Sequence, residues 1–431
     1  MTSPPRPRLP FQPQFRRSLK WLLVVAVLVV AVVAVRVAQN RSNASSPRDT
    51  ESVSEPSPST AAGAATQRDP DGSDGDSDSE TGVDDGDDAV RRIGGLDNVE
   101  TSVFALESVW AVTSNRPDAY SRQPLESSVI RIEPTTRHVE KVLDSPGAAP
   151  TFSELDGRLW VNLSDRIVAL DSTGSEVASI PFAPGKPGDH VAGNHHLWVL
   201  DRVAATVSVI DPQAANIVRT IETGAGPVHP ISAFGYIWVP SIIDGTVTII
   251  DEATLGDTTI IEPFVSSKWL TDVTAVADGL TGDEVWVTNV EGDLFAITAE
   301  GDAFGQVRPI DIDTSINLIH VDDELAFLLP VFGLDVLVLD LATEELVARI
   351  RTESSPFRAA IAHDLVWVAG DGPREILTVI DPNTLTVRQV FSVGTNESNT
   401  TGPQRPLEVD DEIWVPNRGD DAFFIVDIDD V

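Results

Sequence analysis

The chain has 431 residues, contains no cysteine and carries a formal net charge of −37. The lack of cysteine excludes disulfides, cysteine-ligated zinc or iron–sulfur clusters and thiol nucleophiles. The charge argues against binding to DNA or RNA, because nucleic-acid phosphates repel an acidic surface. We therefore expect no nucleic-acid partner and a strongly hydrated surface.

The N-terminal segment predicts a membrane anchor. Residues 1–18 form a basic, proline-rich tail without acidic residues, and residues 19–38 include the uninterrupted apolar run WLLVVAVLVVAVVAV. A helix of this length rises about 30 Å, which matches the hydrocarbon core of a bilayer. The positive-inside rule predicts a single-pass protein of the cell membrane with a cytoplasmic N-terminus and the rest of the chain outside. A cleaved signal peptide is the alternative.

Residues 39–88 read as a disordered linker. This segment has almost no large apolar residue, and acidic residues make up half of the stretch from Asp69 to Asp88. Such a composition cannot bury a core, and like charges extend it. Its spacing resembles a calcium loop starting at Asp74, but Ser79 replaces the glycine that an EF-hand needs at the sixth position. We therefore interpret it as a solvated spacer and predict neither a metal nor a cofactor.

A tryptophan-centred strand then recurs about every 40 to 50 residues through residues 89–431. Each copy is followed by two further apolar strands and preceded by a short one. Four short strands at this period predict a propeller blade, and stacked blades bury each other's faces. The central strands are SVWAV (Trp110), RLWVN (Trp160), HLWVL (Trp198), YIWVP (Trp238), EVWVT (Trp286), ELAFLL (with Ala326 in the tryptophan slot), LVWVA (Trp367) and EIWVP (Trp414).

The count predicts an all-β fold, a propeller of about eight four-stranded blades. The last unit ends at Val431 without its outermost strand. The spare segment Ala89 to Gly95 is the candidate for that strand, which would close the ring from both termini. A seven-bladed ring with one irregular unit is the alternative.

The repeats resemble a known family. TVSVIDP followed by IVRTIETGAGP, and LTVIDPNTLTVRQVFSVG, resemble YVTN-type repeats, with Trp-Val in place of Tyr-Val. The resemblance runs from about Asn98 to the end and implies a β-propeller, a fold that hosts both binding proteins and enzymes. The LWV strands also resemble those of streptogramin lyase, a propeller enzyme with a metal and a catalytic histidine.

The sequence carries no recognisable catalytic motif, and none of its seven histidines shows a metal-ligand spacing with another on one element. A polar residue at the entrance to six innermost strands is more informative, and it stands two residues after a turn proline in the units that have this proline. Innermost strands surround the axis, so these residues should form a ring at one mouth and could bind a polar or anionic ligand. The alternative is that they only hydrate a water-filled channel. The predicted ring residues are Asp189, His229, Thr271, Asn317, Arg358 and Arg405.

Two functions remain open from the sequence. The first is a binding or scaffold module outside the cell, with an unknown small molecule or protein as its partner. The second is a propeller enzyme, a lyase or lactonase acting at the channel mouth. Histidines and carboxylates clustered within reach of a shared metal at that mouth would favour the enzyme, whereas a ring of Arg, Asn and Thr without a carboxylate pair would favour binding.

Overall fold

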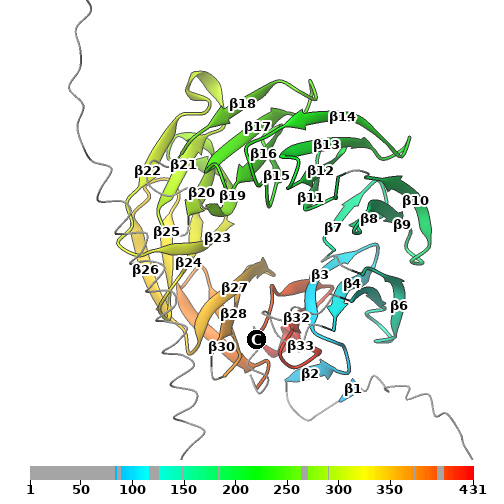
Figure 1. Ribbon diagram of the computed structural model, residues 1–431. Coiled ribbons are helices and arrows are strands. Elements are labelled where there is room, and N and C mark those ends of the chain that lie inside the picture. The colour runs from blue at the N-terminus through cyan, green and yellow to red at the C-terminus, as the bar shows by residue number, and fades with distance from the viewer. Residues whose placement is uncertain are drawn as a thin grey trace, which may run out of the picture. The chain divides into compact units, whose positions relative to one another are not determined.

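The computed structural model describes residues 83–84, 89–115, 126–146, 150–182, 185–263, 270–289, 291–372, 374–395 and 402–431. These residues form eight antiparallel sheets, which stand as the blades of a ring around a common axis (Figure 1). This confirms the eight-bladed propeller and rules out the seven-bladed alternative. In seven of the blades, the strand nearest the axis is the first of its sheet in the chain, whereas the eighth blade begins at the axis with a strand from the C-terminal end and takes its outer strands from the N-terminal end.

The first four blades follow the chain without interruption, each as four consecutive antiparallel strands. Their strands are β3 (Val99–Ala105), β4 (Ser108–Ser114), β5 (Ser127–Ile132) and β6 (Val139–Asp144) in blade 1; β7 (Phe152–Leu155), β8 (Arg158–Asn162), β9 (Arg166–Leu170) and β10 (Glu176–Pro181) in blade 2; β11 (His190–Ala192), β12 (Leu197–Asp201), β13 (Thr206–Asp211) and β14 (Asn216–Glu222) in blade 3; and β15 (Ile231–Ala233), β16 (Tyr236–Ser241), β17 (Thr246–Asp251) and β18 (Thr258–Ile261) in blade 4.

Blades 5 to 7 repeat this arrangement, and blade 8 combines both ends of the chain. Their strands are β19 (Leu270–Gly279), β20 (Gly282–Asn289), β21 (Leu294–Thr298) and β22 (Val307–Ile310) in blade 5; β23 (Ile316–Asp322), β24 (Leu325–Pro330), β25 (Asp335–Asp340) and β26 (Leu346–Arg351) in blade 6; β27 (Ser355–Ala362), β28 (Leu365–Asp371), β29 (Ile376–Asp381) and β30 (Thr386–Ser392) in blade 7; and β31 (Leu407–Val409), β32 (Glu412–Asn417), β33 (Ala422–Asp427), β2 (Val90–Ile93) and β1 (Val83–Asp84) in blade 8. Two short 3-10 helices, η1 (Gly301–Ala303) and η2 (Ile428–Asp430), complete the described elements.

The ring closes through the N-terminal strand of blade 8. Strand β2 pairs with β33 from Val90 opposite Val426 to Ile93 opposite Phe423. This confirms that the segment from Ala89 to Gly95 supplies the missing strand. Strand β1, which lies in the segment predicted to be linker, pairs in turn with β2 and adds a fifth strand. A free sheet edge accepts such an addition because its main-chain groups are unpaired.

Tryptophans fill the interfaces between blades. All seven repeat tryptophans are fully buried. Each packs on the next blade: Trp110 lies against Leu159 and Val161 of blade 2, and Trp414 of blade 8 lies against blade 1. A four-stranded sheet cannot cover its own two faces, so the repeated unit buries them only when the ring is complete.

Blade 6 corrects one assignment from the sequence. Phe327, not Ala326, occupies the tryptophan slot, because Phe327 pairs with His320 as Trp367 pairs with Ala360. Phe327 packs towards blade 7, whereas Ala326 faces blade 5. In a strand, a shift of one residue moves a side chain to the opposite face.

The predicted tail, membrane helix and most of the linker (residues 1–82) lie outside the described residues. Within the described part of the chain, none of the helices has the length and apolar character needed to cross a membrane.

Candidate functional site

The strand registers define one equivalent position per blade on or just before the innermost strand. It lies two residues before the residue that pairs with the slot tryptophan or with Phe327, and we call it the ring position. The ring positions are Thr101, Thr151, Asp189, His229, Asp272, Leu318, Arg358 and Arg405.

Four predicted residues, Asp189, His229, Arg358 and Arg405, occupy ring positions. The other two lie one residue too early, since Asp272 and Leu318 hold the equivalent registers. Thr271 and Asn317 fall at β-bulges, where the strand carries one unpaired residue. These two units lack the turn proline that aligned the others, so the sequence contained no marker for the bulge. The side chain of Thr271 lies outside the described residues.

Asp189 and His229 connect neighbouring blades at their ring positions. The Asp189 Oδ2 atom accepts a hydrogen bond from the main-chain N–H of His229 at 3.0 Å and lies 3.5 Å from His229 Nδ1. The His229 side chain remains largely exposed. The carboxylate of this pair is therefore partly satisfied by the main chain.

Blades 5 to 8 bring together a second group of charged residues. Burial raises the pKa of Asp272 to about 6, although its main-chain hydrogen bonds and the positive charges of Arg358 and Arg405 act in the opposite direction. Burial and the same two guanidinium groups lower the pKa of His320 to about 3. His320 is thus neutral at physiological pH, and its buried Nε2 atom has no hydrogen-bond partner among the residues that the structure describes. We call Asp272, His320, Arg358 and Arg405 the axial cluster.

Contacts within blades 5 to 7 position Asp272 and Arg358 of this cluster. The Asp272 carboxylate accepts from the main-chain N–H of Ile319 at 2.8 Å, which ties β19 to β23. Arg358 donates to the main-chain oxygen of Phe357 at 2.9 Å, and its guanidinium lies 4.2 Å from the centre of the Phe357 ring. Burial lowers the pKa of Arg358, an effect that the Asp272 charge opposes. Desolvation strengthens the interaction of such a guanidinium with an anion.

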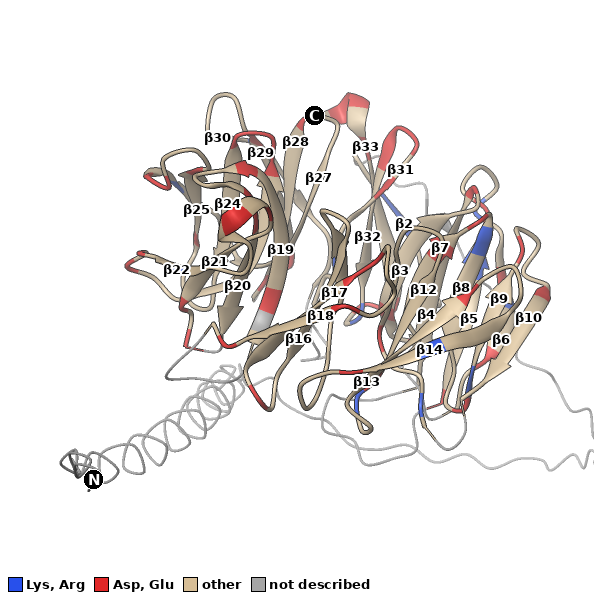
Figure 2. Cartoon of the chain, turned by 90° about the horizontal axis from the view of Figure 1, so that it is seen from above, with Lys and Arg blue, Asp and Glu red and all other residues tan. Residues whose placement is uncertain are grey.

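The two ends of the innermost strands differ in charge. In blade 8, Arg405 precedes β31, whereas Asp410 and Asp411 form the turn at its other end. The exposed acids Asp429 and Asp430 follow β33, and Figure 2 shows red turns near β31 and at the C-terminus. Arg405 of the axial cluster thus lies at the end of β31 opposite the acidic turn.

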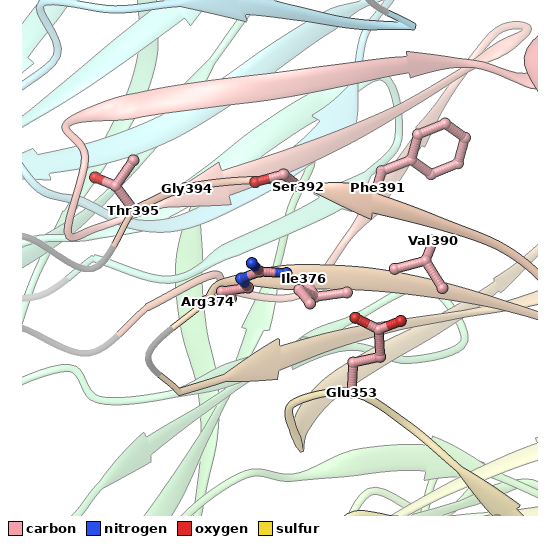
Figure 3. A pocket seen from close by; sticks show the side chains of 8 residues that line it. All are labelled: Glu353, Arg374, Ile376, Val390, Phe391, Ser392, Gly394 and Thr395. Atoms are coloured by element: carbon pink, nitrogen blue, oxygen red, sulfur yellow. The ribbon is translucent and has the colours of Figure 1, made fainter.

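A pocket of about 510 Å³ lies on the outer strands of blade 7, with the apolar side chains of Ile376, Val390 and Phe391 in its wall (Figure 3). Arg374 and Glu353 also line it. It contains no ring position and belongs to outer strands, so we treat the axial cluster as the candidate site. Among the described residues, no group of three or more His, Asp or Glu is arranged to hold a metal ion.

The sequence pattern marked neither Asp272 nor His320 as a residue of the site. The signal for Asp272 was present, because it directly follows Thr271, but the bulge that sets its register has no sequence marker. His320 pairs with Phe327 across β23 and β24. The erroneous placement of Ala326 in the slot therefore also concealed the position of His320.

Comparisons with known proteins agree on the architecture. No protein-family model matches the sequence, and no curated protein matches it either. Among solved structures, the computationally designed protein Ika8 is 14% identical with a TM-score of 0.57, covering 77% of this chain and 100% of its own. The dihydro-heme d1 dehydrogenase NirN, in complex with DHE, is 14% identical with a TM-score of 0.56, covering 73% of each chain.

A streptogramin B lyase structure is also 14% identical, with a TM-score of 0.48 and coverage of 64% of this chain and 93% of its own. At such identities structural likeness shows the fold alone, since one propeller architecture hosts unrelated functions. Fold and registers together identify the described part of the chain as an eight-bladed β-propeller.

Proposed function

We propose that this propeller is a binding module that holds a small anionic ligand at the axial cluster. The observation that carries the proposal is that the positive charges of two guanidinium groups, Arg358 and Arg405, act on the same carboxylate and the same imidazole. In a chain of net charge −37, the half-buried Arg358 and the exposed Arg405 outweigh the single carboxylate of Asp272 and leave local positive charge. Such charge favours a carboxylate or phosphate.

The neutral imidazole of His320 supports the same chemistry. Its Nε2 atom is buried and has no partner within the described residues. A buried polar atom without a partner costs free energy, and a ligand that supplies the missing hydrogen bond recovers it. We therefore expect a ligand that combines an anionic group for the arginines with a hydrogen-bonding group for His320.

Binding of inorganic phosphate and citrate, measured by titration calorimetry on the full-length protein, tests this proposal. Arg358→Gln and Arg405→Gln should each weaken binding by about 10- to 100-fold, the range expected for a lost charge-assisted hydrogen bond. Arg388→Gln on the exposed outer strand β30 is the control and should bind normally. Equal affinities in all four proteins, or no binding of either anion, would refute the site.

An enzyme is the second candidate, a lyase or lactonase acting at the same cluster. The observation in its favour is Asp272, because a carboxyl group with a pKa of about 6 can exchange a proton near neutral pH. Loss of turnover in Asp272→Asn with retained ligand binding would support catalysis. An unchanged rate in that variant would leave binding as the function.

We also propose that residues 19–38 hold the protein in the cell membrane, with the propeller outside. The apolar run and its basic N-terminal flank support this. Full-length protein should stay in the membrane pellet after a carbonate wash. A mature chain that begins near Ser45 would instead indicate a cleaved signal peptide.

The repeat pattern supports kinship with YVTN-type propellers. The V-x-V-I-D strand of TVSVIDP is β13, the third strand of blade 3, so the motif falls within a blade as in a repeat unit. Homologues that keep this motif in every blade would support the kinship. Homologues with unrelated motifs in β13 and β29 would contradict it.

A further inference from the structure

A second group of acidic residues lies between blades 7 and 8, apart from the axial cluster. Glu375, directly before β29, is fully buried. Its Oε2 atom accepts a hydrogen bond from Asn417 Nδ2 at 2.5 Å, and the same Nδ2 donates to the main-chain oxygen of Val393 at 2.6 Å. Asn417 ends β32, so these bonds tie the second strand of blade 8 to blade 7.

Asp420 approaches the same point from the turn after β32. Its Oδ2 atom accepts from the main-chain N–H of Thr395 at 2.8 Å and lies 3.4 Å from Asn417 Nδ2. A Cβ atom on Gly394 would collide with carboxylate oxygens of both Glu375 and Asp420. Only a glycine, therefore, lets the chain pass this close to the two carboxyl groups.

The groups that face Glu375 are negatively charged or neutral. Asp420 faces it from blade 8 and Asp371 from the end of β28, while Asn417 is its neutral partner. Arg92 of β2 donates to the main-chain oxygen of Asp420 at 2.8 Å. The second carboxyl oxygen of Glu375 is buried and has no hydrogen-bond partner within the described part of the chain. Burial, with the charges of Asp420 and Asp371, raises the pKa of Glu375 to about 7.

We propose that Glu375 keeps its proton in the folded ring and shares it with Asp420, so that a proton-dependent contact joins blades 7 and 8. Two carboxyl groups that both approach the same amide nitrogen, Asn417 Nδ2, cannot both be ionised without strong repulsion, and one shared proton replaces that repulsion with a hydrogen bond. When the proton leaves, the contact between the blades weakens.

The contact adjoins the chain segment that carries Arg405. Pro403 bridges to the main chain of Asn417, and the Gln404 N–H donates to the Pro416 oxygen at 2.7 Å. Arg405 follows directly. If the axial cluster binds an anion as proposed above, loss of the shared proton should also weaken that binding through Arg405. This consequence rests on the proposed function, whereas the contact itself does not.

The test compares thermal unfolding of the full-length protein and Glu375→Gln between about pH 4 and pH 8. The folded-state pKa of Glu375 lies above its ordinary value of 4.5. Its stabilising contribution is therefore complete below pH 4.5 and is lost as the pH rises through about 7. Glutamine can still accept from Asn417 and donate to Asp420, so the variant should unfold about 4 °C above the natural protein at the alkaline end, and at the same temperature at the acidic end.

Two further variants complete the design. Glu353→Gln, an exposed residue nearby, should follow the natural protein at every pH. Asp420→Asn removes the repelling charge and should also flatten the pH dependence, which provides a second measurement if Glu375→Gln folds poorly.

Parallel curves for Glu375→Gln, Asp420→Asn and the natural protein would overturn the proposal. So would a rise in the unfolding temperature of the natural protein on adding Ca²⁺ at alkaline pH that Glu375→Gln lacks, since the group would then be a cation site. A pH-dependent difference in unfolding without any phosphate or citrate binding would support the contact and contradict only the proposed function.

Discussion

The interfaces between blades and the inner strands at the axis are built from the same repeat but differ in residue type and burial. At the interfaces, the seven repeat tryptophans are fully buried, and those of blades 1 and 8 pack among aliphatic side chains of the next blade. At the axis, the ring positions vary from threonine and leucine to aspartate, histidine and arginine. The repeat thus preserves the residues that hold blades together and leaves the axial residues free to differ between blades.

Charge inside the protein follows the same division. Arg358 and Asp272 are partly desolvated at the axis, where burial alone shifts both pKa values towards the neutral forms. Such groups cost stability, because desolvation disfavours their charged forms. Residues that cost stability and that the repeat does not require are candidates for function.

Removing the N-terminal strand β2 should lower the stability of the ring more than the other changes described below. A chain that starts at Asp97 lacks β2, whose Ile93 is buried, and exposes the edge of β33. We expect a loss on the order of 5 kcal/mol and more aggregation, because a buried aliphatic side chain and a strand ladder are lost together. Calorimetric unfolding of this chain and of one starting at Ala89 measures the difference. Equal melting temperatures would show that closure does not depend on β2.

Truncating one interface tryptophan should have the next largest effect. Trp238→Ala should cost about 3 to 5 kcal/mol, since it leaves a cavity between blades 4 and 5. Arg358→Gln should cost far less or even stabilise the protein, because it relieves a desolvated charge. Denaturant unfolding of both variants makes the comparison. A larger loss of unfolding free energy in Arg358→Gln than in Trp238→Ala would contradict this ranking.

Phenylalanine substitutions measure how much the indole hydrogen bond contributes to the stability of individual interfaces. Blade 6 shows that Phe327 fits the slot. Trp238 Nε1 donates to the Ala233 oxygen at 3.1 Å, whereas Trp198 Nε1 is buried and finds no acceptor among the described residues. Trp238→Phe should therefore destabilise the protein by about 1 kcal/mol more than Trp198→Phe. Similar losses in chemical denaturation would indicate that the indole hydrogen bond contributes nothing.

The smallest expected effect concerns the axial charges. The positive charge of Arg358 lowers the pKa of Asp272, so Arg358→Gln should raise this pKa above its present value of about 6. A titration of the Asp272 carboxyl carbon by NMR measures the shift. Arg388→Gln, on the outer strand, should leave the titration unchanged. An unaltered pKa in Arg358→Gln would mean that the two groups do not interact at the axis.

The sequence alone determined the architecture. The period of the tryptophan strands predicted eight four-stranded blades, and the spare segment before the first blade predicted the closing strand near Phe424. These features are readable because each blade is a local unit of consecutive antiparallel strands. The sequence also predicted Asp189, His229, Arg358 and Arg405 at equivalent positions of their blades, which the registers confirm, since turn prolines marked the starts of their strands.

Only the tertiary structure decided the registers without such markers and the contacts between blades. The bulges that place Asp272 and Leu318 at ring positions, and the turn that places Phe327 in the slot, each depend on one residue of offset. The meeting of Glu375 with Asn417 depends on how blade 7 packs against blade 8. A repeat pattern fixes what lies within a blade, but the approach of side chains from different blades follows from the packing of the closed ring.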